Sequence, residues 1–192
     1  MTKNFLALAL LASSALFSVT AVSPALAADA SPATAACAGC HGKDGASTNK
    51  NMPIIGGQSS DYISNTLTDF KTGERGNCGD KKASPMCGIA KKLSSDDIEQ
   101  IAKDYAGKPF VRAGQKADAA LAQKGKEIAA DTCDQCHAEG VILAGQWMPY
   151  LKAQLNDFHA GKRTKPDSMM TRIQKLDPVS IDALVQYYGS FK

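Results

Sequence analysis

Cys37-Ala38-Gly39-Cys40-His41 and Cys133-Asp134-Gln135-Cys136-His137 are the two stretches that decide the fold of this 192-residue chain. Two cysteines two residues apart and a following histidine form the C-x-x-C-H signature of covalent haem attachment. The thiols become thioethers to one porphyrin, and the histidine is placed beneath the iron as its proximal ligand. A dithiol redox pair or a four-cysteine zinc site would leave both histidines unexplained. The sequence therefore predicts two covalently bound haems, attached through Cys37, Cys40, Cys133 and Cys136, with His41 and His137 on the irons.

Each iron needs a second axial ligand from elsewhere in the chain, and methionine is the natural candidate. His159 is the one spare histidine, so a second histidine on both irons is excluded. Met86 stands in one polar segment, and Met169 and Met170 stand in a similar one. We expect both segments to be loops, in which a methionine has no packing role. Met86 is therefore predicted to bind the first iron and Met169 the second, with Met170 and His159 as alternatives.

The second half of the chain repeats the first. Residues 55–62 match 143–150, and residues 69–75 match 157–163, both at an offset of 88. Near the ends, residues 92–94 match 175–177 at an offset of 83, which places Met86 opposite Met169. An internal repeat of this length indicates two homologous domains.

Apolar spacing predicts helices, and no strand-like alternation is present, so both domains are expected to be all-α. Ser94 and Asp97 form a capping box before apolar residues at positions 98, 101, 102 and 105. Asp177 caps the matching helix, in which Pro178 takes the first position. Middle helices are expected near 62–71 and 149–159, and a longer helix over 117–130 leads into the second attachment motif.

The first 27 residues are predicted to be a secretory signal peptide. Lys3 supplies the positive start, an apolar stretch follows, and Ala25-Leu26-Ala27 is a small-x-small cleavage signal. Removing them takes away one lysine, so the formal charge falls from +3 to +2, which gives no support for a nucleic-acid partner. No later segment has the length of a membrane span. We expect a periplasmic protein with domains at 28–107 and 117–192 and a linker at 108–116.

Two further cysteines, Cys78 and Cys87, lie nine positions apart on either side of the Met86 segment. In an oxidising compartment a disulfide between them would stiffen this segment. The alternative is that a Cys87 thiolate displaces Met86 from the first iron.

Other matching residues are candidates for contact with the haems. Arg75 and Arg163 occupy equivalent positions and could pair with haem propionates, because a guanidinium suits a carboxylate; the alternative is a pair of solvated surface arginines. Gln58, Gln146 and Trp147 are expected to line haem edges.

With these motifs the chain resembles the diheme class I cytochromes c, the cytochrome c4 family. The two C-x-x-C-H segments, the G-Q-x-x-x-Y segments, the D-F-x-x-G-x-R segments and the two methionines carry this resemblance over essentially all of the chain after residue 27. Trp147-Met148-Pro149-Tyr150 is most similar to the second domain of the cytochrome subunit of flavocytochrome c sulfide dehydrogenase. The resemblance implies two tandem class I cytochrome c domains, each enclosing one haem.

If histidine and methionine saturate both irons, no coordination position is left for a substrate. We therefore expect electron transfer without a catalytic site on this chain. The resemblance implies a flavoprotein sulfide dehydrogenase subunit as partner, or alternatively a free carrier that feeds a terminal oxidase or reductase. A third possibility is a haem enzyme that itself oxidises a sulfur compound, as in thiosulfate dehydrogenases, but it requires an axial ligand other than methionine.

Overall fold

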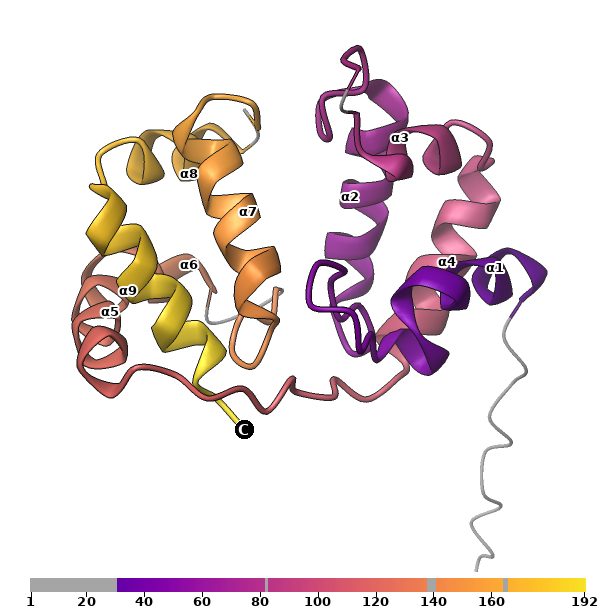
Figure 1. The fold of residues 1–192 in the computed structure, drawn as a ribbon. Helices are drawn as coiled ribbons and strands as arrows, with labels where there is room; N and C mark the ends of the chain where they lie inside the picture. The colour runs from indigo at the N-terminus through magenta and orange to yellow at the C-terminus, as the bar shows by residue number, and fades with distance from the viewer. Residues whose placement is uncertain (1–30, 82, 138–140, 164–165) are drawn as a thin grey trace, which may run out of the picture.

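The computed structural model describes residues 31–81, 83–137, 141–163 and 166–192, so the predicted signal peptide lies outside the described residues. The helices form two groups that stand side by side and are joined by an extended segment (Figure 1). No strand occurs within these ranges, which confirms the all-α prediction. Among the described helices, none has the length and apolar character needed to cross a membrane.

The first group contains four α-helices and one 3-10 helix, namely α1 (Pro32–His41), η1 (Lys43–Gly45), α2 (Ser60–Thr72), α3 (Pro85–Ala90) and α4 (Ser95–Ala106). The second group contains α5 (Ala119–Thr132), α6 (Asp134–His137), α7 (Met148–His159), α8 (Asp167–Ile173) and α9 (Pro178–Gly189). Between Ala106 and Ala119 the chain is not helical and runs along one side of both groups (Figure 1). The predicted linker falls within this segment.

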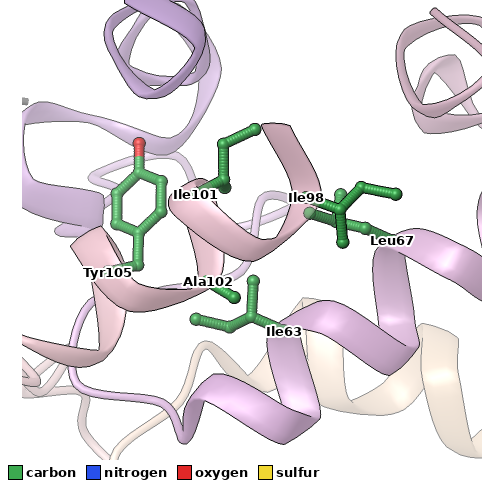
Figure 2. Close-up of a cluster of buried hydrophobic side chains, with 6 residues drawn as sticks. All are labelled: Ile63, Leu67, Ile98, Ile101, Ala102 and Tyr105. Carbon is green, nitrogen blue, oxygen red and sulfur yellow. The ribbon is translucent and has the colours of Figure 1, made fainter. Parts of the chain in front are cut away.

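The core of the first group forms where α2 packs on α4. Its buried side chains come from these two helices, as Figure 2 shows: Ile63, Leu67, Ile98, Ile101, Ala102 and Tyr105. The apolar stripe predicted on α4 is therefore confirmed. The capping box is confirmed as well, because Ser94 Oγ accepts a hydrogen bond from the Asp97 backbone at 3.0 Å and Asp97 Oδ2 accepts one from the Ser94 backbone at 2.9 Å.

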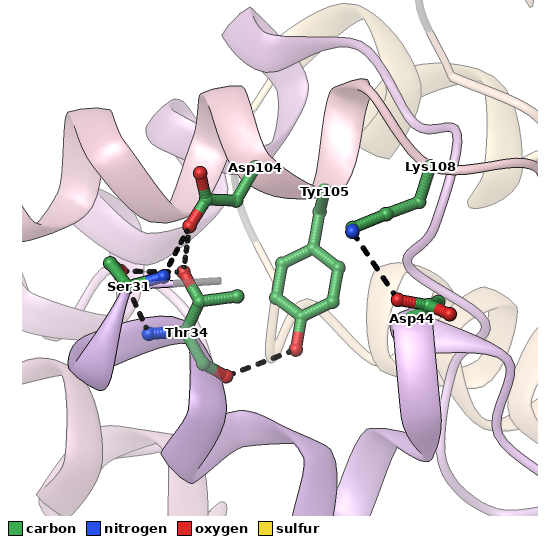
Figure 3. Close-up of polar contacts among 6 residues, drawn as sticks. All are labelled: Ser31, Thr34, Asp44, Asp104, Tyr105 and Lys108. Atoms are coloured by element: carbon green, nitrogen blue, oxygen red, sulfur yellow. Dashed lines mark hydrogen bonds and ion pairs between the residues drawn. The ribbon is translucent and has the colours of Figure 1, made fainter. Parts of the chain in front are cut away.

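Polar contacts attach α1, which carries the first attachment motif, to α4 (Figure 3). Asp104 Oδ2 accepts hydrogen bonds from Thr34 Oγ1 at 2.6 Å and from the Ser31 backbone at 3.2 Å. The Tyr105 hydroxyl donates to the Thr34 carbonyl at 3.3 Å. The position of α1 is thus fixed on the helix that supplies most of the core.

The second group is built on the crossing of α5 and α9. The two backbones touch at Gly125, where an added Cβ would lie 2.0 Å from the Ala183 carbonyl oxygen. Only glycine permits this approach. It brings together the buried side chains of Ala129, Cys133, Leu151, Leu184, Val185 and Tyr188. Asp177 caps α9 as predicted, by accepting from the Ser180 backbone at 2.6 Å.

The segments that carry Met86 and Met169 are short helices, and the prediction that they are loops is wrong. Ser84 caps α3 through its side chain, and Pro85 takes the first helical position. These are start signals that can form a single turn without a long apolar stripe. Met86 is half-buried and packs against the core of the first group, so it does have packing neighbours.

Candidate haem-binding sites

The first attachment motif lies on the last two turns of α1. Cys37 packs against the core, Cys40 is exposed, and His41 is buried. His41 Nδ1 lies 3.1 Å from the Pro53 carbonyl oxygen. Because a carbonyl only accepts, Nδ1 carries the proton and the lone pair is on Nε2. Burial also lowers the pKa of His41, which favours the neutral ring that a metal ligand requires.

The second attachment motif begins at Cys133, which directly follows α5 as its C-cap, and continues through all of α6. Cys133 is buried in the core, whereas Cys136 is exposed. His137 Nε2 lies 3.2 Å from Met169 Sδ, and burial lowers the pKa of His137. Its buried Nδ1 has no hydrogen-bond partner among the described residues. A histidine nitrogen and a thioether sulfur therefore converge at one point, although 32 residues separate them in the sequence.

A cavity of about 440 Å³ surrounds this point. Cys133, His137 and Met169 line it from the second group, and Tyr62 and Asn65 of α2 line it from the first. Its size suits an organic cofactor, and it reaches the junction between the two groups. Of the two alternative ligands, Met170 does not line the cavity, and His159 is exposed at the end of α7.

The two matching arginines lie at the junction, where Arg75 is buried and Arg163 is half-buried. Arg75 is 5% exposed and donates to Tyr150 Oη at 3.1 Å and to Gln154 Oε1 at 2.7 Å. Arg163 Nη1 donates to the same Gln154 oxygen at 3.1 Å, while its buried Nε has no partner among the described residues. Burial and the like charge of Arg75 lower the pKa of Arg163, against the opposite effects of Tyr62 and other neighbours. The junction is therefore a place where a further anion would be stabilised.

Cys78 and Cys87 form a disulfide with a Cα–Cα distance of 5.5 Å. It joins the segment after α2 to α3, directly beside Met86. Because both sulfur atoms are used in this bond, Cys87 has no thiolate to offer to an iron. The disulfide prediction is confirmed, and the structure contradicts the thiolate alternative.

The three residues that were expected to line haem edges make hydrogen bonds across the junction between the two helix groups. Gln58 and Gln146 are buried and form hydrogen bonds with the backbone of the opposite helix group. Trp147 Nε1 donates across the same junction to the Ser47 carbonyl at 2.8 Å. None of the three lines the 440 Å³ cavity. The repeat indicated that Gln58 and Gln146 are equivalent residues. It could not indicate that each glutamine contacts the opposite half of the chain.

This all-α architecture, with a C-x-x-C-H motif in each half, defines a two-domain class I c-type cytochrome. No family model matches the chain. Among curated proteins, cytochrome c4 of Stutzerimonas stutzeri is 32% identical over 170 residues, which cover 77% of this chain and 80% of that protein. The chain therefore belongs to the cytochrome c4 family, and it carries two covalently bound haem c groups.

Two further relatives extend this comparison. The crystal structure of reduced recombinant cytochrome c4 from Pseudomonas stutzeri matches with a TM-score of 0.71 and 31% identity, covering 85% of this chain and 99% of that one. A protein described as a thiosulfate dehydrogenase electron acceptor, from Stutzerimonas stutzeri strain A1501, is 29% identical over 158 residues, or 72% of this chain and 70% of that protein. The chain is thus a cytochrome c4-like diheme protein of electron transfer.

Proposed function

We propose that each half of the chain holds one haem through its own C-x-x-C-H motif and one methionine. Cys37 and Cys40 attach the first haem, which His41 and Met86 ligate. In the second half the corresponding residues are Cys133, Cys136, His137 and Met169. In the second half, the observation that carries this proposal is the 3.2 Å approach of His137 Nε2 to Met169 Sδ at the cavity. In the first half it is supported by the repeat, which places Met86 opposite Met169. We further propose the domain limits 28–107 and 117–192 with a linker at 108–116.

Haem iron supplies one-electron redox chemistry, and the chain's residues set its surroundings. Donation from His41 Nδ1 to the Pro53 carbonyl fixes the ring orientation and keeps Nε2 available as a ligand. A methionine as the sixth ligand raises the reduction potential and leaves no open position for a substrate. The disulfide beside Met86 holds this ligand segment in place. Together these features support electron transfer without substrate chemistry.

The arginine pair at the junction supplies a site for haem propionates. Arg75 and Arg163 share one amide oxygen, and the buried Arg163 Nε is unpaired among the described residues. A carboxylate would relieve the repulsion between the two guanidiniums and accept the unused donor. The propionate edges of the haems would then point towards the junction, where electrons can pass between the halves.

The partner we propose is a periplasmic oxidoreductase that acts on a sulfur compound and passes its electrons to this chain. The similarity to a thiosulfate dehydrogenase electron acceptor supports this choice. A flavoprotein sulfide dehydrogenase is the second candidate, supported by the Trp147-x-Pro149-Tyr150 segment of α7. A free carrier that feeds a terminal oxidase or reductase is the remaining candidate.

Two experiments test these assignments. Met169→Ala should shift the potential of one haem and leave the other unchanged, whereas an unchanged redox titration would move the ligand to Met170 or His159. For the partner, the oxidised protein is mixed with a thiosulfate dehydrogenase or with a sulfide dehydrogenase flavoprotein, each with its substrate. Rapid reduction by only one of them identifies the donor class, and no reduction by either supports the free carrier.

A further inference from the structure

Two glutamines related by the repeat cross the junction in a reciprocal arrangement. Gln58 Nε2 donates to the Ile142 carbonyl at 2.9 Å, and its Oε1 accepts from the Ile142 backbone N–H at 2.8 Å. Gln146 does the same with Ile54, with both distances at 2.9 Å. The offset of 88 relates both the two glutamines and the two isoleucines. Each side-chain amide thus satisfies both backbone groups of one residue in the opposite half.

The contact between Gln146 and Ile54 excludes water, whereas Gln58 is buried but its partner Ile142 is half-buried. Gln58 is 2% exposed, Gln146 is 3% exposed and Ile54 is 2% exposed. Hydrogen bonds in such an environment are strong, and a buried backbone group that loses its partner is costly. The two glutamines therefore fix the backbone at positions 54 and 142 whenever the two halves are docked.

Within the residues that the structure describes, the contact of Gln146 continues to a predicted haem ligand and that of Gln58 does not. The Pro53 carbonyl and the Ile54 N–H belong to the same peptide group. The carbonyl accepts from His41 Nδ1 at 3.1 Å, and the N–H donates to Gln146 Oε1 at 2.9 Å. An unbroken hydrogen-bonded path therefore runs from the proximal histidine of the first half, through one peptide group, to a glutamine of the second half.

The equivalent path from Gln58 to His137 lacks its last hydrogen bond within the described residues. Gln58 binds the Ile142 N–H, but His137 Nδ1 has no hydrogen-bond partner among the described residues. Gln58 therefore has the same amide, a similarly buried side chain and the same kind of backbone contact as Gln146, although Gln146 Oε1 also accepts from the Trp147 backbone at 3.1 Å. Unlike Gln146, Gln58 has no path of this kind to a histidine within the described part of the chain. It serves as a matched control within the same chain.

On the basis of the two-haem assignment proposed above, we infer that Gln146 is a positioning residue for the haem of the first half. By accepting from Ile54 N–H it polarises the peptide group and makes the Pro53 carbonyl a better acceptor. This strengthens donation from His41 Nδ1 and the basicity of Nε2, which favours the oxidised iron. The second half thereby lowers the reduction potential of the first haem through this hydrogen-bonded path.

The test is a redox titration of the diheme holoprotein carrying Gln146→Leu or Gln58→Leu. The two couples are assigned with Met169→Ala, which identifies the haem of the second half. In Gln146→Leu the first haem should become easier to reduce. At a given potential its ratio of oxidised to reduced form should fall about twofold to tenfold, which corresponds to a rise in reduction potential of at most about 59 mV for one electron. The second haem should not respond. Gln58→Leu should leave the first haem unchanged.

A second readout does not depend on redox chemistry. Hydrogen exchange of the Ile54 amide should accelerate in Gln146→Leu but not in Gln58→Leu. If Gln146→Leu does not mature with two haems, Gln146→Asn keeps the polarity but is too short to bridge both backbone groups, and the same shift is expected. An unchanged first haem, or an equal shift in the Gln58 variant, overturns the inference. A wild-type protein with fewer than two redox couples would instead refute the two-haem assignment.

Discussion

Gly125→Ala tests the crossing of α5 and α9 on which the second haem site is built. The added Cβ would meet Ala183 O at 2.0 Å, Ala183 C at 2.5 Å and the Tyr187 Cβ at 2.8 Å. Ordinary contacts begin at 3.4 Å. Two of the clashing atoms belong to the backbone and the third is a Cβ, so no rotamer change can move them. The two helices would therefore have to separate, which disturbs the packing of Cys133 and Tyr188.

The expected cost follows from two opposing effects. Overpacking a core costs about 1–3 kcal/mol, and a backbone clash belongs at the upper end of that range. Alanine in place of glycine inside a helix stabilises the folded protein by about 1 kcal/mol through its higher helix propensity. A net loss of about 2 kcal/mol is expected, or about 8–16 °C in the melting temperature if the second half melts as its own unit of 60–100 residues.

The assay is thermal and urea unfolding of the diheme protein, followed by helical circular dichroism and by haem absorbance. Gly88→Ala in α3 is the matched control, because a Cβ there would have no atom within 4 Å. This control should be neutral or stabilised by up to about 1 kcal/mol. A Gly125→Ala protein at least as stable as wild type would refute the close crossing of α5 and α9.

Three further outcomes are expected. Replacing both Cys78 and Cys87 by serine should destabilise the first half by about 2–3 kcal/mol. In urea titrations the methionine–iron absorption band of that half should then disappear at a lower urea concentration than in wild type. An unchanged midpoint of this transition would show that the disulfide does not support Met86. Arg75→Gln should make the free energy of haem reduction less favourable, on the order of 1 kcal/mol, because a positive charge favours the reduced iron. Potentiometry that finds the reduction potentials of both haems unchanged would place the propionates elsewhere. Slight burial of Asp104 opposes ionisation, but hydrogen bonds from Thr34 and Ser31 lower the pKa of this carboxylate below the ordinary 3.8. Ionised Asp104 therefore stabilises the fold above pH 3.8, and this stabilisation is lost as the pH falls through the lowered pKa. Asp104→Asn should lower the melting temperature at pH 7 and make the melting temperature fall less in acid; a fall as steep as in wild type would contradict this.

Local patterns were sufficient for most of the fold. The apolar stripe of α4 and the Ser94 cap were predicted from spacing and residue type, and the structure confirms both. The α3 and α8 helices were missed because each is a single short element without an apolar period. Ser84 and Pro85 did signal the start of α3, but a start signal alone does not establish a helix.

The contacts between the halves were beyond sequence reasoning for a different reason. Period and spacing describe one element at a time, whereas Gln146 acts on the backbone of a residue 92 positions away. The repeat made Arg75 and Arg163 equivalent, yet only the docked structure shows that both guanidiniums reach Gln154. Long-range partners of this kind depend on how two folded units meet.

The two-haem assignment is best tested by peptide mass spectrometry of the mature protein, isolated with its haems intact and without reduction. We expect one haem on the peptide that contains Cys37 and Cys40, one on the peptide that contains Cys133 and Cys136, and a haem-free disulfide between Cys78 and Cys87. A mature protein with only one haem-bearing peptide, or with haem on Cys78 or Cys87, would contradict it.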